Sequence, residues 1–186
     1  MSRMITGWRW LHEPTTWSRD DRTLTVTADP DTDFWRTTHY GFVRDTGHVY
    51  GTDVDGDLVL RATFAGAYRD QYDQAGIALR VDAANWIKSG IELVDGHQQI
   101  SAVVTREFSD WSVAPVAAPR TVTIEAARVG DTVTIRYGLD GAEPTTTLRL
   151  AYLPPDRPVF AGVMAAAPDG RGFTTTFADV SLTPGG

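Results

Sequence analysis

The sequence contains no cysteine, and this absence excludes three kinds of site. A chain without thiols has no disulfide bond, no thiolate metal site and no cysteine nucleophile. Its 186 residues also include no apolar run that approaches the ~18 residues of a membrane span. The first residues, MSRMITGWRWLHEP, lack the apolar region and the cleavage site of a signal peptide. We therefore expect a cytoplasmic protein that does not contact a membrane.

Basic residues are fewer than acidic ones, with 17 Lys and Arg against 24 Asp and Glu, which gives a formal net charge of −7. Nucleic acids and anionic membrane surfaces require clustered Lys and Arg, so we expect neither as the main partner. The charge suits a neutral or cationic small molecule instead. The four histidines lack the spacing of a metal site, and no Gly-rich phosphate loop is present. We therefore predict no bound metal and no cofactor.

Tryptophan, in contrast, is plentiful, with six residues in the chain. Large aromatic side chains can fill a core, but they also form flat surfaces on which sugars and other rings stack. Their number is compatible with a packing role and with a binding role.

Hydrophobic and polar residues alternate through most of the chain, which is the period-two pattern of β-strands. Turn signals such as Asp55-Gly56, Asp95-Gly96 and Asp140-Gly141 separate these stretches, and no window has helical periodicity. The pattern predicts an all-β fold, a two-sheet antiparallel sandwich. No linker interrupts it, so we expect a single domain over residues 1–186. The predicted strands cover residues 24–29, 57–64, 75–82, 86–95, 99–106, 121–130, 131–140, 145–153, 158–167 and 174–183.

The stretch from Trp86 to Val94 raises the main functional question, because its two faces differ. Ile87, Ile91 and Leu93 point to one side and form the core face. The other register is mostly polar, and the neighbouring strands extend it if they pair in sequence order. Over these strands that register contains Tyr72, Gln74, Arg80, Trp86, Lys88, Glu92 and Thr105. It is either an ordinary solvated sheet face or the surface of a binding groove.

Five short motifs occur in an order that resembles a known family. They are WLHEP (Trp10–Pro14), TDFWRTTHYGF (Thr32–Phe42), YDQAG (Tyr72–Gly76), NWIKSGIE (Asn85–Glu92) and TREFSDWS (Thr105–Ser112). From about Trp8 to Leu182 the chain is similar to the DUF1349 family, which includes YesU-like bacterial proteins and a fungal protein named for the regulation of enolase. The resemblance implies a jelly roll of the concanavalin A-like lectin/glucanase type with a concave groove. Its recurring polar and aromatic positions, carried over to this sequence, are Trp35, His39, Tyr72, Asp73, Gln74, Trp86, Lys88, Glu92, Arg106, Asp110 and Trp111.

The first functional hypothesis is a module that binds a saccharide or a related small polar metabolite. In this interpretation Trp86 and Trp111 stack on the ligand in the groove. Polar contacts would come from Gln74, Lys88, Glu92 and Arg106.

The second hypothesis is an enzyme that acts on glycosides, which requires two carboxyl groups flanking one bond. Glucanases of the implied fold carry the pattern Glu-x-Asp-x-Glu on one strand, and of these acids only Glu92 is present here. Glu92 would be the acid or base, and the second carboxylate would come from Asp73 or Asp110. Arg106 is the expected partner of Glu92, and it would keep the carboxylate ionised. The alternative is that this pair is only a cross-strand ion pair on a solvated face.

A third hypothesis, a regulatory binding partner of a metabolic enzyme, rests only on the name of the fungal family member. It predicts an exposed apolar patch outside the groove. The sequence shows no such patch, and it predicts no oligomeric state.

Overall fold

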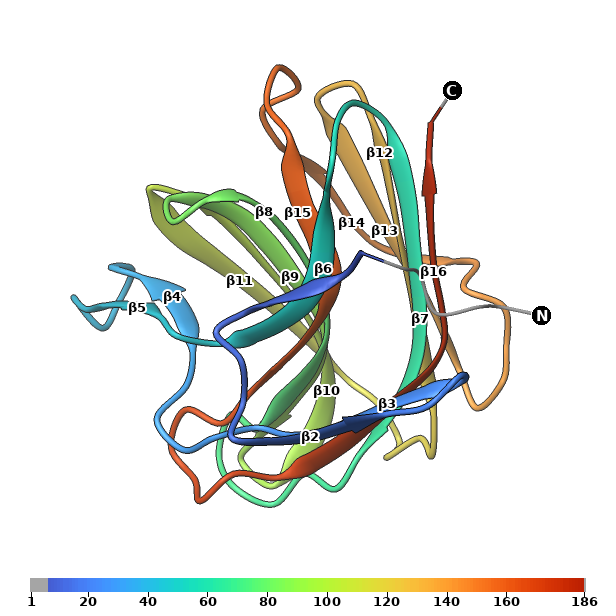
Figure 1. The fold of residues 1–186 in the computed structure, drawn as a ribbon. Coiled ribbons are helices and arrows are strands. Elements are labelled where there is room, and N and C mark those ends of the chain that lie inside the picture. Colours follow the sequence, from blue (N-terminus) through green and yellow to red (C-terminus); the bar gives the residue numbers. More distant parts are fainter. Residues whose placement is uncertain (1–6, 186) are drawn as a thin grey trace.

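The computed structural model describes residues 7–185, and within this range it contains strands but no helix. Two seven-stranded antiparallel sheets pack face to face, and a two-stranded hairpin lies outside them (Figure 1). The fold is therefore the predicted all-β jelly-roll sandwich of the concanavalin A-like lectin/glucanase type. In the described part of the chain, no helix is long and apolar enough to cross a membrane.

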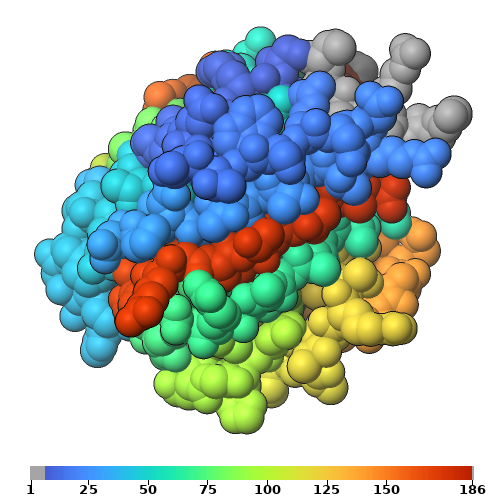
Figure 2. Space-filling view, turned by 60° about the horizontal axis from the view of Figure 1, so that its bottom comes forward, coloured from blue at the N-terminus to red at the C-terminus, as the bar shows by residue number. Residues whose placement is uncertain are grey.

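Each sheet combines strands that are consecutive in the sequence with strands from distant parts of it. The first sheet has the order β1 (Arg9–Leu11), β6 (His48–Val54), β15 (Val159–Ala166), β8 (Gln74–Asp82), β9 (Asn85–Val94), β10 (His97–Arg106) and β11 (Phe108–Pro115). The second has the order β14 (Thr146–Tyr152), β13 (Thr132–Leu139), β12 (Val122–Val129), β7 (Leu58–Gly66), β16 (Thr174–Pro184), β3 (Thr23–Thr27) and β2 (Thr16–Arg19). Figure 2 shows β16 as a red band between the blue N-terminal segments and β7. Every stretch with predicted alternation forms a strand.

The hydrophobic core lies between the sheets because alternate residues of each strand face inward. In β7, Leu58, Leu60 and Phe64 are buried, whereas Val59 is 40% exposed. In β9, Ile87 belongs to the same core cluster. Each such side chain contributes about 1.5–3 kcal/mol when it is fully buried. The core face predicted from the sequence is confirmed.

The turn between β9 and β10 sets the register on which the outer face depends. Asp95 and Gly96 both have positive φ, 51° and 78°, as a two-residue type I′ hairpin requires. This turn aligns Glu92 with Gln99, and β8 aligns Gln74 with Glu92 on the other side. The strands β8, β9 and β10 are thus neighbours, as predicted, and their polar registers form one surface.

The hairpin of β4 (Phe34–Arg36) and β5 (Val43–Asp45) covers part of that surface. Phe34 and Trp35 form a second apolar cluster with residues of the first sheet. Arg36 N donates a hydrogen bond to Ser109 Oγ (2.9 Å), and Asp45 pairs with Arg80 of β8 at 2.7 Å. The first sheet is therefore covered on both faces, by the second sheet inside and by the hairpin outside.

Candidate functional site

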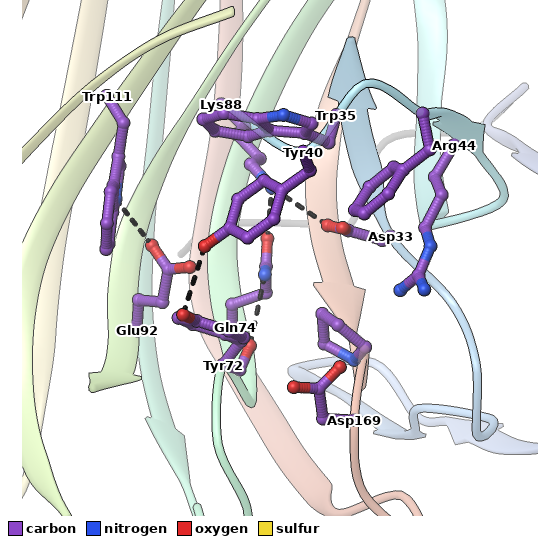
Figure 3. Close-up of a pocket in the computed structure, with 12 residues that line it drawn as sticks. Asp33, Trp35, Tyr40, Arg44, Tyr72, Gln74, Lys88, Glu92, Trp111 and Asp169 are labelled. Atoms are coloured by element: carbon purple, nitrogen blue, oxygen red, sulfur yellow. Dashed lines mark hydrogen bonds and ion pairs between the residues drawn. The ribbon is translucent and has the colours of Figure 1, made fainter. Parts of the chain in front are cut away.

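A cleft of about 190 Å³ opens on the outer face of the first sheet, beside the hairpin (Figure 3). Its volume lies below the roughly 300–1,000 Å³ that is usual for drug-sized ligands, so it suits a single small molecule. Figure 3 shows Trp35 at the top of this space, Tyr72 at its bottom and Trp111 at one side. The lining residues are Asp33, Trp35, Tyr40, Phe42, Arg44, Tyr72, Gln74, Lys88, Glu92, Trp111, Pro168 and Asp169.

Lys88 fastens the hairpin to the sheet. Its Nζ donates to Gln74 Oε1 (2.6 Å) and Phe34 O (2.8 Å), and it pairs with Asp33 Oδ1 at 3.3 Å. An ammonium group has three N–H donors, so these three acceptors use all of them. The Lys88 and Asp33 side chains are only 6% and 11% exposed. This geometry makes Lys88 a structural cation, without a free hydrogen for a ligand.

Glu92 is buried next to this pair, and its two oxygens differ. Oε2 accepts hydrogen bonds from Ser101 Oγ and from Trp111 Nε1, both at 2.9 Å. Oε1 has no hydrogen-bond partner within residues 7–185, and in Figure 3 it points away from Trp111 into the cleft. Burial raises the pKa of Glu92, and the charge of Asp33 adds to this, while Lys88, Ser101 and Trp111 oppose it. The cleft therefore holds a carboxyl group with one oxygen available to a ligand.

Two tyrosines meet across the cleft. Tyr40, on the loop of the hairpin, and Tyr72, just before β8, are joined through their hydroxyl groups at 3.2 Å. This hydrogen bond, followed by burial, raises the pKa of Tyr40 to about 12. Tyr72 has a φ of 66°, a left-handed conformation that is costly for a non-glycine residue and is often found at functional sites. Its backbone nitrogen donates to Leu93 O (2.7 Å), which holds it there.

Aromatic faces and one arginine complete the rim. Tyr40 and Phe42 stack with ring centroids 5.3 Å apart, and the Arg44 guanidinium lies 4.4 Å from the Phe42 ring centroid. Trp111 is 36% exposed, and its indole orientation is fixed by its bond to Glu92. A fixed, partly exposed indole is suited to stacking on a flat ligand.

The structure brings together six of the residues that the sequence singled out and leaves the others outside the cleft. Inside are Trp35, Tyr72, Gln74, Lys88, Glu92 and Trp111. Outside are His39, Asp73, Arg80, Trp86, Thr105, Arg106 and Asp110.

The expected stacking surface of Trp86 is not available. Trp86 does lie in the outer register, as predicted, but it is only 3% exposed. Phe34 of the hairpin covers it, with ring centroids 5.8 Å apart. Thr105, which pairs with Trp86 in the sheet, is fully buried and bonded to Ser109 (2.7 Å). These residues support the hairpin.

The expected second carboxylates also lie elsewhere. Asp73 is fully buried and accepts hydrogen bonds from the backbone nitrogens of Arg69 (2.9 Å) and Asp70 (3.0 Å), which form a turn. Asp110 pairs with Val104, a core residue, so its side chain leaves β11 on the side opposite to that of Trp111. Neither can act together with Glu92.

The expected pair of Arg106 and Glu92 is wrong. Arg106 is aligned with Asn85, at the other end of β9. Its guanidinium lies 5.2 Å from the ring centroid of Tyr152. His39 is exposed on the hairpin loop, where its ring contacts Tyr40.

Six lining residues were missed, and all of them lie outside the long strands. Four, Asp33, Tyr40, Phe42 and Arg44, belong to the hairpin region, and all of these except Arg44 are within the motif TDFWRTTHYGF. The others, Pro168 and Asp169, follow β15. Strand parity could not find them, although the motif was a signal for part of the set. Among residues 7–185, no group of three His, Asp or Glu side chains is arranged to hold a metal ion.

Comparisons with known proteins found a matching family model, a curated relative and similar solved structures. The model of DUF1349, described as a protein of unknown function, matches residues 10–185. Regulation of enolase protein 1 from Saccharomyces cerevisiae is 36% identical over 180 residues, which cover 94% of this chain and 88% of that protein. A crystal structure of a functionally unknown protein from Saccharomyces cerevisiae has a TM-score of 0.90 at 35% identity and covers 96% of both chains.

Two more distant structures share only the fold. The GH43 protein BlXynB from Bacillus licheniformis has a TM-score of 0.72 at 14% identity, and this chain spans 37% of its length. The carbohydrate binding module CBM66 from Bacillus subtilis has a TM-score of 0.55 at 12% identity, with 95% of both chains covered.

Proposed function

The chain belongs to the DUF1349 family, and from this premise we propose that its cleft binds one small polar ligand, a saccharide of about one ring. The observation that carries the proposal is the combination of an exposed, hydrogen-bonded Trp111 with a free carboxyl oxygen on Glu92 in the same space. Sugars present an apolar ring face and polar hydroxyl groups, so they require both kinds of contact.

The other walls support the same ligand class. Five of the twelve lining residues are aromatic, and Gln74, Tyr72 and Asp169 add polar atoms at the lower side. The chain also shares its fold with a protein named as a carbohydrate binding module. The volume of about 190 Å³ favours a single sugar unit over a length of polymer.

The direct test is a titration with a panel of mono- and oligosaccharides, including pectin fragments. Tryptophan fluorescence and calorimetry detect the binding. We expect a saturable signal that the Trp111→Ala variant loses. Trp17→Ala is the matched control, because Trp17 is 37% exposed and lies on β2 in the second sheet. The absence of a saturable signal with every sugar would overturn the proposal. Enolase belongs in the same titration, since the name of the yeast relative suggests a protein partner.

Glycoside hydrolysis is the second candidate, and one observation favours it. The cleft contains a buried carboxyl group on Glu92 and an exposed one on Asp169. Two carboxyl groups in such different environments can act as the general acid and the general base of one reaction. Glu92 would protonate the leaving oxygen, while Asp169 would accept a proton from the attacking water. Release of a reducing sugar by the wild type, lost in both Glu92→Gln and Asp169→Asn, would establish turnover. Binding without release would leave the binding function alone.

A further inference from the structure

The charges inside the cleft do not balance. Its lining contains three acids, Asp33, Glu92 and Asp169, and two bases, Arg44 and Lys88, so the acids exceed the bases by one. Asp33 and Lys88 form an ion pair at 3.3 Å. Glu92 forms no ion pair with any residue in the described part of the chain.

Neither base forms an ion pair with Glu92, although the nearby charge of Lys88 acts to lower its pKa. Lys88 lies on the same face of β9, but its three hydrogens are used by Gln74, Phe34 and Asp33. Arg44 belongs to β5 and lies over the Phe42 ring. A buried carboxylate without a positive partner is costly, so the site is completed either by a proton or by a cationic ligand.

The remaining groups that face Glu92 are also compatible with a cation. Ser101 and Trp111 donate to Oε2 and leave Oε1 free. Tyr40 and Tyr72 hydrogen-bond each other, and Tyr40 lies in the field of both Glu92 and Asp169. Aromatic ring faces attract cations through their quadrupole, and this attraction strengthens when the cation is desolvated.

We propose that the ligand is an amino sugar with an unacetylated amine, whose ammonium group pairs with Glu92 Oε1 while the ring lies against Trp111. This inference rests on the proposed saccharide function and adds the charge of the ligand to it. The net charge of −7 on the chain favours the approach of a cation.

The pairing has a second consequence, which concerns protons. In the empty cleft, burial raises the pKa of Glu92. An ammonium group next to Oε1 favours the ionised form, so binding lowers this pKa and releases a proton. A neutral sugar has no such effect. Calorimetry in buffers with different ionisation enthalpies measures the number of protons released.

The experiment compares D-glucosamine with D-glucose, which has a hydroxyl in place of the amine. Near neutral pH we expect the wild type to bind glucosamine about tenfold more tightly, because charge-assisted hydrogen bonds are roughly twice as strong as neutral ones. At a pH low enough for Glu92 to be protonated in the empty cleft, proton release should accompany glucosamine alone. In Glu92→Gln, the affinity for glucosamine should fall to that for glucose or below it, and the proton release should disappear. Asp110→Asn, which removes an acid outside the cleft, should keep both.

The possible results separate this inference from the proposed function. Equal and saturable binding of the two sugars by the wild type would overturn the amino-sugar assignment and leave saccharide binding in place. A preference for glucosamine that persists in Glu92→Gln would also overturn it, since the amine would then have another partner. If neither these sugars nor the wider panel gave a saturable signal, both proposals would fail. N-acetylglucosamine, with a neutral amide, should bind no better than glucose.

Discussion

The two faces of the first sheet are both buried, but by different partners and with different side chains. On the inner face, Ile87 and Ile91 of β9 pack in the apolar core against the second sheet. On the outer face, Lys88 and Glu92 from the same strand are 5% and 7% exposed beneath or beside the hairpin. Burial of charged groups costs several kcal/mol unless they find partners. The inner face therefore explains how the two sheets pack. On the outer face, Lys88 holds the hairpin, and Glu92 lines the cleft to which we assign a ligand.

The largest loss of stability from a change on the outer face is expected at Lys88. In Lys88→Met, Asp33 would remain buried without its cation, so we expect a loss of about 3–5 kcal/mol in the free energy of unfolding. Ile91→Ala, the matched inner-face variant, should cost about 2–5 kcal/mol through its cavity. Urea unfolding measures both. The two variants should differ in binding, because only Lys88→Met releases the hairpin that forms a wall of the cleft.

A double variant checks the cause of the first loss. Lys88→Met combined with Asp33→Asn removes both charges, and we expect it to recover most of the stability. If the double variant were as unstable as Lys88→Met, the lost hydrogen bonds to Phe34 and Gln74 would be the cause, and not the unpaired carboxylate.

The inner face was largely predictable from the sequence, and the reason is local. Alternation over eight or more residues is a property of each strand, and β7, β8, β9 and β10 show it clearly. The strands that were not predicted are β1, β2, β4, β5, β6 and β11. Most are three or four residues long, and β11 is an edge strand whose Trp111 and Val113 are both exposed. Short and edge strands bury too few alternate residues to produce the pattern. The inner strand β6 lacks it for another reason, because its first four residues are all buried.

The outer face was predictable only in part. Parity correctly placed Gln74, Lys88 and Glu92 on one surface, because side chains alternate along a strand. It could not show that Phe34 covers Trp86, since the two are distant in sequence. It also could not supply Asp33, which reaches Lys88 from 55 positions away. What covers a face is decided by tertiary contacts, and these leave no period in the sequence.

The pH dependence of stability can separate the two faces, because Glu92 on the outer face ionises, whereas Ile87 and Ile91 on the inner face do not. Its pKa is raised in the folded protein by burial. Below the ordinary carboxyl range both folded and unfolded states are protonated, and the full stability is present. As the pH rises, Glu92 ionises first in the unfolded state, which stabilises that state. The contribution of Glu92 to the free energy of unfolding therefore falls until the pH passes its pKa in the folded protein.

Glu92→Gln should remove that part of the dependence. In the absence of sugar, we expect its stability relative to the wild type to increase as the pH rises above the ordinary carboxyl range. Chemical unfolding at a series of pH values measures the difference, in which the raised pKa of Asp73 cancels because both proteins contain it. A difference that stays constant with pH would contradict the buried, unpaired state of Glu92.

The smallest loss of stability is expected at Arg106. This residue lies at the end of β10, outside the cleft to which we assign a function. Arg106 is exposed, and its guanidinium lies 5.2 Å from the centroid of the Tyr152 ring. Such an exposed contact contributes about 0.5–1 kcal/mol, so Arg106→Ala should lower stability by no more than that. Arg106→Ala should not change the affinity for sugar. It should also not change how the stability difference caused by Glu92→Gln depends on pH, because Arg106 is aligned with Asn85 and not with Glu92. A large change in either would mean that the surface acting on the ligand extends along β10 to its end, beyond the cleft beside the hairpin.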